Sequence, residues 1–188
     1  LADGQEAEDM QVFVDAVKPL GSEIHVYGKF LSEEDDAEFE NELYWIPMEL
    51  VEEPKDTGLT QSQFIEYNYK IPAKGSSPDT GLNGSGVFEY DVYRVSGATV
   101  TGGGSGYTAP PIVTFSGGSS DKQAKGYAQI SAGAVTNIVI TDPGRYTDAT
   151  VPTVTLTGGG GSGATATSAT PALTTFSTIK KFAVKVVF

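Results

Sequence analysis

The chain has 188 residues, a formal net charge of −12, one histidine and no cysteine. This length suffices for one ordinary domain or two small ones, and the lack of cysteine excludes disulfides and thiolate metal sites. Lys and Arg form no cluster, which argues against a nucleic-acid partner, and no apolar run approaches the roughly 18 residues of a membrane span.

The charge is unevenly distributed along the chain. Residues 1–58 hold 17 Asp or Glu and three Lys, whereas residues 97–169 hold three acids and three bases. We therefore expect the two regions to be built differently. The chain begins with Leu1 and shows no signal-peptide pattern, which fits an excerpt or a processed product.

Two early segments alternate apolar and polar residues. They are MQVFVDAVKP, residues 10–19, and SEIHVYGKF, residues 22–30. A period of two is typical of half-buried strands, so both segments are predicted to be β-strands.

The next stretch, LSEEDDAEFENELYW, is acidic and allows two interpretations. Ser32 followed by Asp35 could cap a short helix with Phe39 and Leu43 on its inner face, or the stretch could be a solvated loop. The acidic segment 33–42 could also hold calcium through oxygen ligands, although it lacks the glycine-punctuated spacing of calcium loops.

Four later segments also read as strands. Pro47 places the first of them near a sheet edge or a bulge, because proline cannot donate to a ladder. Alternation predicts that Ile65, Tyr67, Tyr69 and Ile71 share one face. The four segments are LYWIPMELVEE, FIEYNYKIP, GVFEYDVYRVS and TFSTIKKFAVKVVF.

Between residues 96 and 171 the composition changes, because 15 of the 23 glycines lie there. This region repeats itself with a period near 40 residues, and each unit carries a tyrosine, a proline, a β-branched strand and then SGG or TGG. Glycines supply the positive φ angles of tight turns between such strands. The aligned pairs are Tyr107 with Tyr146, Pro111 with Pro152, Val113 with Val154 and Phe115 with Leu156.

Two repeats are too few for a self-sufficient solenoid, so they must pack on each other or on another part of the protein. If the strands GVFEYDVYRVS and TFSTIKKFAVKVVF pair as antiparallel neighbours, the repeats are an insertion at a hairpin tip. We therefore predict an all-β fold. It consists of a β-sandwich-like host domain, residues 1–95 plus 171–188, with a glycine-rich two-repeat β-insertion at residues 96–170.

The units GGGSGYTAPPIVTFSGG and VTNIVITDPGRYTDATVPTVTLTGG resemble glycine-rich repeats of tailed-phage virion proteins. IHVYGKFLSEEDDAEFENELYWIPMEL, FIEYNYKIP and FSTIKKFAVKVVF are similar to a domain of large structural proteins in contractile-tailed phages of marine cyanobacteria. The resemblance implies a virion tail or baseplate component and supplies no catalytic residues. Arg145 departs from the repeat pattern, since a small residue or glycine is usual there.

Little in the chain points to catalysis. His25 is the sole histidine and lies in an alternating strand, so no Ser-His-Asp triad or histidine-rich metal site is supported. The acidic run offers many carboxylates, but spacing selects no pair for glycoside cleavage. The GGGSG and GGGGSG runs lack the GK[ST] of a phosphate loop and are predicted to be turns.

Tyr107, Tyr146 and Arg145 are the candidate ligand or surface contacts. The tyrosine rings could stack on sugars, or each could pack beneath its own glycine turn and order it.

We expect a non-enzymatic virion protein without a cofactor, which contacts other virion subunits, forms a homo-oligomer and touches a host-surface glycan. The alternatives are a carbohydrate-binding or adhesive β-module and a glycan hydrolase domain.

Overall fold

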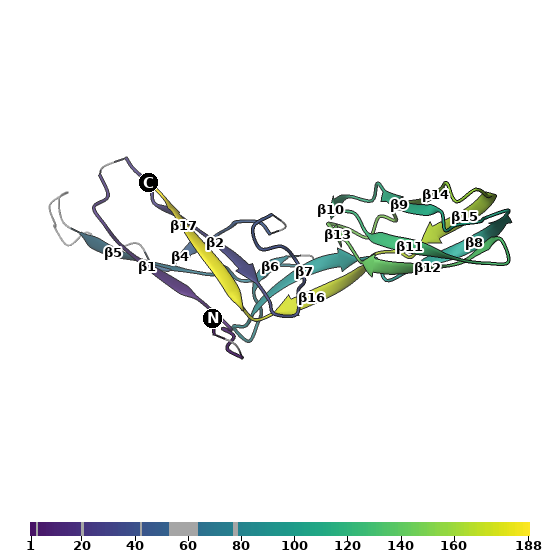
Figure 1. The fold of residues 1–188 in the computed structure, drawn as a ribbon. Coiled ribbons are helices and arrows are strands. Elements are labelled where there is room, and N and C mark those ends of the chain that lie inside the picture. The colour runs from purple at the N-terminus through teal and green to yellow at the C-terminus, as the bar shows by residue number, and fades with distance from the viewer. Residues whose placement is uncertain (3, 20, 42, 53–63, 77–78) are drawn as a thin grey trace. The chain divides into compact units, whose positions relative to one another are not determined.

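The computed structural model describes residues 1–188 except residues 3, 20, 42, 53–63 and 77–78. Every regular element in the described part is a β-strand, so the predicted all-β class is confirmed. The chain forms two compact units, shown in Figure 1: unit 1, Leu1–Tyr90 with Thr175–Phe188, and unit 2, Asp91–Thr174. The chain passes into unit 2 within β7 (Phe88–Arg94) and returns within β16 (Ala172–Ser177). Among the described residues, no helix is long and apolar enough to cross a membrane.

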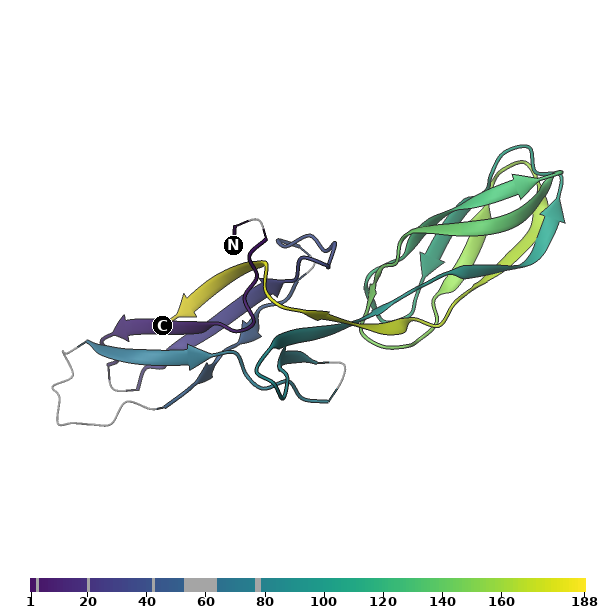
Figure 2. The same ribbon diagram turned by 90° about the horizontal axis from the view of Figure 1, so that it is seen from below.

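Unit 1 contains two three-stranded antiparallel sheets, which Figure 2 shows from a second side. The short strands β3 and β4 follow each other in the chain but belong to different sheets. Pro47 lies in the edge strand β3, as its missing N–H predicts. One sheet has the order β1 (Gln11–Ala16), β5 (Ile65–Lys70), β4 (Glu49–Leu50); the other has the order β17 (Lys181–Val187), β2 (His25–Leu31), β3 (Ile46–Pro47).

Aromatic rings make up much of the core of unit 1. Phe88 packs against Phe30 and Tyr90, with ring centroids 4.9 Å and 5.8 Å apart, and Tyr90 stacks on Phe176 at 5.4 Å. Pairs of this kind add to the free energy of burial. The alternation predicted for residues 64–72 is confirmed, since Tyr67, Tyr69 and Ile71 are buried.

The acidic stretch after β2 is not helical in its described residues. Ser32 and Asp35 are buried, and the Tyr90 hydroxyl donates a hydrogen bond to Asp35 Oδ2 at 2.7 Å. Asp35 Oδ1 accepts a bond from the Ala37 N–H at 3.1 Å, which is a local turn rather than a helix cap. The helix interpretation is therefore wrong, because these two side chains bond to the core and to a turn. Leu43 lies in no helix or strand of the structure.

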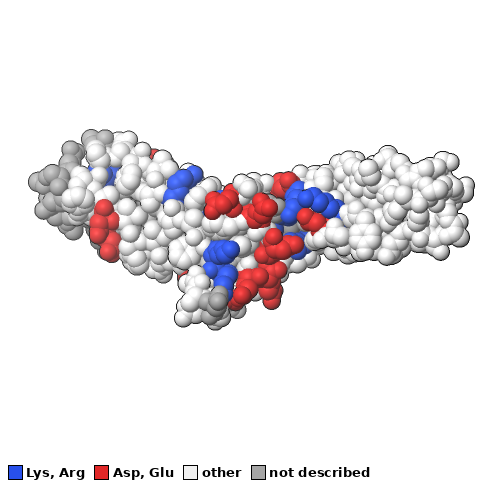
Figure 3. Space-filling view, viewed as in Figure 1, with Lys and Arg blue, Asp and Glu red and all other residues white. Residues whose placement is uncertain are grey.

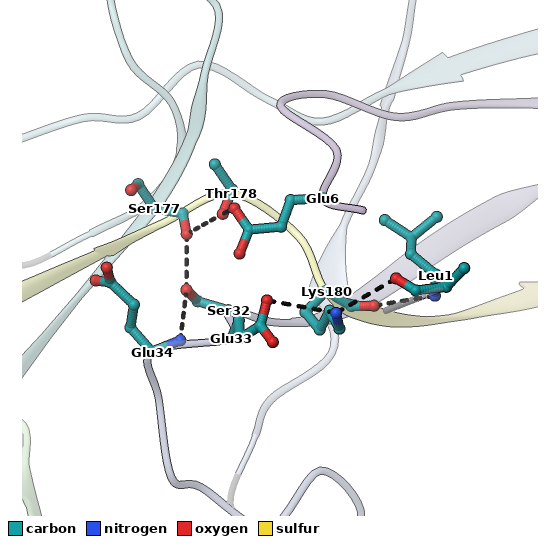
Figure 4. A network of polar contacts seen from close by, with 9 residues as sticks. Leu1, Glu6, Ser32, Glu33, Glu34, Ser177, Thr178 and Lys180 are labelled. Carbon is teal, nitrogen blue, oxygen red and sulfur yellow. Dashed lines mark hydrogen bonds and ion pairs between the residues drawn. The ribbon is translucent and has the colours of Figure 1, made fainter. Parts of the chain in front are cut away.

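Figure 4 shows the polar contacts that hold the start of β17 in unit 1. Ser32 Oγ donates to Ser177 O at 2.7 Å, and Lys180 Nζ lies 3.3 Å from Glu33 Oε2. Thr178, between β16 and β17, has a φ of 64°, an uncommon value for a β-branched residue. Its hydroxyl donates to Glu6 Oε2 at 2.6 Å.

The closing segment therefore forms two strands rather than one. β16 is a neighbour of β7, which also pairs with β6 (Thr80–Leu82), whereas β17 pairs with β2 over seven residues. The turn at Thr178 separates β16 from β17. The predicted pairing of residues 86–96 with residues 175–188 therefore holds for β16 and not for β17.

Unit 2 has a four-stranded sheet, a two-stranded sheet and a small pairing at its base. At the base, β10 (Ser120–Lys122) pairs with β13 (Arg145–Tyr146), and β13 also pairs with β7. The larger sheet has the order β11 (Lys125–Ser131), β12 (Ala134–Asp142), β8 (Ala98–Ser105), β15 (Ser162–Ser168); the smaller one pairs β14 (Thr153–Thr157) with β9 (Ile112–Ser116).

The two sequence repeats interlock inside unit 2. The first repeat supplies β8, β9 and β11, and the second supplies β12, β14 and β15 in the same order. The middle strands pair with each other, so Val154 lies opposite Phe115 and Leu156 opposite Val113. The last strand of each repeat pairs with the first strand of the other, β11 with β12 and β15 with β8. The repeats thus pack on each other, and neither forms its sheets alone.

Candidate functional site

His25, the sole histidine, lies at an exposed position of β2. Its Nε2 atom is 3.1 Å from Glu23 Oε2, and both side chains are more than half exposed. The two residues border a hollow of about 270 Å³ in unit 1, lined further by Met48, Tyr67 and Tyr69. Glu23 is the one carboxylate among its described lining residues, so this hollow presents no pair of acids for glycoside cleavage.

The described residues of the acidic segment 33–42 supply no cluster of three carboxylates for calcium. Among the described residues, no group of three His, Asp or Glu side chains lies close enough to hold a metal ion. Within this segment, Phe39 O and Glu40 O accept hydrogen bonds from Lys29 Nζ at 3.2 Å and 3.1 Å.

Tyr107 is buried in unit 2 beneath a glycine turn. A Cβ atom on Gly161 would lie 2.5 Å from Tyr107 Cγ, and one on Gly159 would lie 2.9 Å from Tyr107 Cδ1. Gly159 also has a φ of +74°, which favours glycine. The Tyr107 ring therefore occupies the space that a side chain at Gly159 or Gly161 would need.

Tyr146 is also buried against a glycine, in this case Gly144 of its own repeat. A Cβ atom on Gly144 would lie 2.8 Å from the Tyr146 ring. The hydroxyl accepts a hydrogen bond from the Ala124 N–H at 3.0 Å and lies 3.3 Å from Gln123 Oε1. The Tyr107 hydroxyl accepts a longer bond from the Ala164 N–H at 3.4 Å. Each tyrosine thus bonds to the backbone of the other repeat.

The environment of Tyr146 shifts its ionisation. Burial raises the pKa of the Tyr146 phenol above its ordinary value; the hydrogen bond from Ala124 lowers it by less, and the charge of Asp142 adds to the rise. The phenol therefore stays protonated, as its hydrogen bond to Gln123 Oε1 requires.

Arg145 is also buried, in the short strand β13 opposite Lys122. Lys122 in turn forms an ion pair with Asp142 at 3.1 Å, so the charges at the base of unit 2 gather close together. The structure places all three candidate residues, Tyr107, Tyr146 and Arg145, inside unit 2 rather than at its surface. This burial favours packing over ligand contact, because an enclosed ring cannot stack on a sugar. Tyr107 lies beneath the glycine run 158–161 of the other repeat rather than beneath its own turn.

Strand β17 is an exposed apolar edge of unit 1. It has β2 as its one neighbour among the described strands. Phe182 and Val184 are 47% and 38% exposed, although their partners Phe30 and Gly28 are buried. Val187, on the other face of the strand, is 42% exposed. A long apolar edge of this kind is a template for pairing with another chain.

Of the two lysines of β17, Lys185 at its centre does not shield this edge. Lys185 Nζ lies 4.7 Å from the centroid of the Tyr27 ring and 5.0 Å from that of Trp45, on the outer face of the sheet. Lys29 Nζ lies 5.2 Å from the same Trp45 ring. These cation–π contacts hold the Lys185 ammonium over its own sheet rather than beyond the edge.

The charged side chains are confined to part of the surface. Figure 3 shows Lys, Arg, Asp and Glu over unit 1 and at the base of unit 2, and the rest of unit 2 is white on this face. In the four-stranded sheet the charged residues are Lys125 and Asp142, which are Cα partners at one end.

The outer face of that sheet carries uncharged polar groups and one exposed aromatic ring. Tyr127 on β11 is 50% exposed, and Asn137 Nδ2 donates a hydrogen bond to Gln129 Oε1 at 3.0 Å. Thr101 and Thr165 bond to each other through their hydroxyls at 2.9 Å. Sequence reasoning named neither this face nor the β17 edge, although the alternation in KGYAQIS, residues 125–131, already places Tyr127 and Gln129 together.

Comparison with known proteins leaves the chain without a match. No protein-family model, no curated protein and no solved structure matches it.

Proposed function

We propose that this chain is a non-enzymatic structural subunit of a phage virion, from a tail, baseplate or fibre, and that it assembles with a second copy of itself through β17. The observation that carries the proposal is the open edge of β17 with its exposed Phe182, Val184 and Val187. The assignment to a virion is supported by the resemblance of the glycine-rich repeats and of the closing strand to tailed-phage structural proteins.

The sequence of β17 suits antiparallel pairing with itself. Centred on Val184, such a pairing sets Phe182 opposite Val186 and Ala183 opposite Lys185, and no lysine faces a lysine. Like charges directly opposite would destabilise a sheet, whereas aromatic and β-branched pairs stabilise it. A two-fold axis through Val184 would use the same surface on both copies, as in most homodimers.

Pairing of this kind would join two three-stranded sheets into one continuous sheet. The free N–H and C=O groups of both edges would then be satisfied, and the apolar side chains of both strands would be covered. These two gains explain why an exposed edge of this composition is useful in a protein that assembles into a particle.

Light scattering of the full chain tests the proposal. The wild-type protein is expected at twice its 19.7 kDa mass, because the β17 edges pair. Val184→Lys sets two ammonium groups face to face at the two-fold axis and should return the mass to 19.7 kDa. Val151→Lys is the matched control, since Val151 is an exposed valine outside any strand, and it should leave the dimer intact.

A wild-type chain that stays monomeric at high concentration would contradict self-assembly through this edge. A dimer that survives Val184→Lys would also contradict it, since the interface would then lie elsewhere.

A further inference from the structure

We propose that the outer face of the sheet β11-β12-β8-β15 in unit 2 binds an uncharged polysaccharide, with Tyr127, Gln129 and Asn137 as its central contacts. This inference goes beyond assembly and concerns a different unit, so it does not depend on the pairing of β17.

Tyr127 is the aromatic ring of this face. Its side chain is 50% exposed, and its cross-strand partner is the half-buried Val139. Tyr107 and Tyr146, the buried tyrosines of the same unit, order glycine turns, whereas Tyr127 covers no turn and faces outward on its strand. An exposed ring beside a valine provides the apolar surface on which the C–H face of a sugar stacks.

The two amides lie next to the ring. Asn137 Nδ2 donates to Gln129 Oε1 at 3.0 Å, which turns the two amides toward each other. The Gln129 Nε2 donor and the Asn137 Oδ1 acceptor make no hydrogen bond in the described part of the structure. A donor beside an acceptor matches neighbouring sugar hydroxyls, because each hydroxyl both donates and accepts.

Threonines continue the polar face across the other two strands. Thr99 and Thr167 are exposed Cα partners, and Thr99 follows Ala98, the partner of Ile138, so it shares the face of Asn137. Thr101 and Thr165 add a second pair of hydroxyls, 2.9 Å apart. Four strands at about 4.8 Å spacing give a face roughly 14 Å wide, which suits an extended polymer.

The charges select the class of ligand. In this sheet Lys125 and Asp142 lie opposite each other at one end, and the remaining residues are uncharged. A nucleic acid or an acidic polysaccharide would find no row of basic groups here. The abundance of threonine and the single exposed ring distinguish the face from protein interfaces, whose centres are rich in aromatic residues and methionine. An uncharged polysaccharide is therefore the ligand that fits.

Affinity electrophoresis of the full chain tests the proposal with named probes. Native gels would contain hydroxyethylcellulose, laminarin or galactomannan as neutral polymers and alginate as the anionic one. We expect retardation by a neutral polymer and none by alginate. Tyr127→Ala should weaken the binding about tenfold by removing the stacking surface, and Gln129→Ala should weaken it by a smaller factor.

Ile112→Ala is the matched control, since Ile112 is an exposed apolar residue on the two-stranded sheet of the same unit. It should bind as the wild type does. The proposal is overturned if none of the three neutral polymers retards the protein, if Tyr127→Ala and Gln129→Ala bind unchanged, or if alginate alone retards it. Val184→Lys should bind as the wild type does, which separates this site from the assembly edge.

Discussion

Unit 1 and unit 2 close a β core in two different ways. Unit 1 packs rings such as Phe30, Phe88, Tyr90 and Phe176 between short sheets and leaves β17 open. Unit 2 has few rings, and its two repeats exchange strand partners so that each completes the sheets of the other. The comparison shows that two glycine-rich repeats can enclose a core of mostly aliphatic side chains, such as Val95, Ile138 and Val154, by pairing reciprocally.

The same difference separates the two proposed roles. The exposed apolar edge is in unit 1, where it can pair with another copy. The uncharged polar face is in unit 2, where the sheet surface is covered with hydroxyls and amides rather than with apolar side chains. The two proposals thus assign assembly and ligand contact to different units of one chain.

Phe88→Ala is expected to have the largest effect, because it removes a fully buried ring that contacts two others. We expect unit 1 to lose about 3–5 kcal/mol of unfolding free energy. Urea unfolding followed by the fluorescence of Trp45, the single tryptophan, reports on unit 1 alone. Phe13→Ala, at a side chain 58% exposed, is the control and should change little. If hydrogen exchange showed that unit 2 loses the same unfolding free energy, the two units would not have separate cores.

Gly161→Ala tests the close approach in unit 2. The new Cβ would lie 2.5 Å from the Tyr107 ring and 2.6 Å from Ser105 O, so either the ring or the backbone must move. We expect a loss of about 3 kcal/mol in unit 2, measured by peptide-resolved hydrogen exchange. Gly97→Ala meets no atom within 4 Å and is the control. If both variants lose the same stability, the cost comes from the lost backbone flexibility of glycine and not from a steric clash with Tyr107.

Tyr146→Phe tests the bonds between the repeats. It leaves the buried Ala124 N–H without its acceptor, for an expected cost of about 1–2 kcal/mol in unit 2. Tyr107→Phe removes a longer bond, to the Ala164 N–H at 3.4 Å, and should cost less. Hydrogen exchange in β11 and β15 would measure the two effects. The reverse order would contradict the hydrogen-bond geometry.

The smallest expected effect is the pH dependence due to Tyr146. Its pKa is raised in the folded state, mainly by burial, so the stability that it contributes is complete below the unfolded value of about 10. That stability is lost as the pH rises from there through the folded pKa. Unit 2 of Tyr146→Phe should therefore lose less stability than the wild type between about pH 9 and about pH 11. If the unfolding free energies of the two proteins fell equally with pH, ionisation of the Tyr146 phenol would not be coupled to folding.

The sequence predicts the strands well because alternation is a local property. Residues 64–72 bury the predicted face, residues 88–94 form the predicted strand, and both repeated tyrosines, Tyr107 and Tyr146, are buried. Alternation does not reveal which strand lacks a neighbour. Phe182 and Val184 look like core residues in the sequence, yet they lie half-exposed at a sheet edge.

In the acidic stretch, the local sequence pattern of a helix cap likewise failed to predict the structure. Ser32 and Asp35 have the spacing of a helix cap, but their partners are Ser177 and Tyr90, more than 50 residues away. Contacts between distant segments, set by the tertiary fold, decide such positions. Sequence patterns predict the candidate contacts at the repeated tyrosines Tyr107 and Tyr146. The exposed aromatic residue of the four-stranded sheet is instead Tyr127, which is not among the aligned repeat positions.

The most direct test of assembly through β17 is amide hydrogen exchange of the full chain at low and high protein concentration. Our account predicts that residues 181–187 gain protection as the concentration rises, because the free edge of β17 becomes hydrogen-bonded to a second copy. Residues 162–168, in the edge strand β15 of unit 2, should exchange at the same rate at both concentrations. Protection that never rises in residues 181–187, or that rises in residues 162–168 instead, would contradict the account.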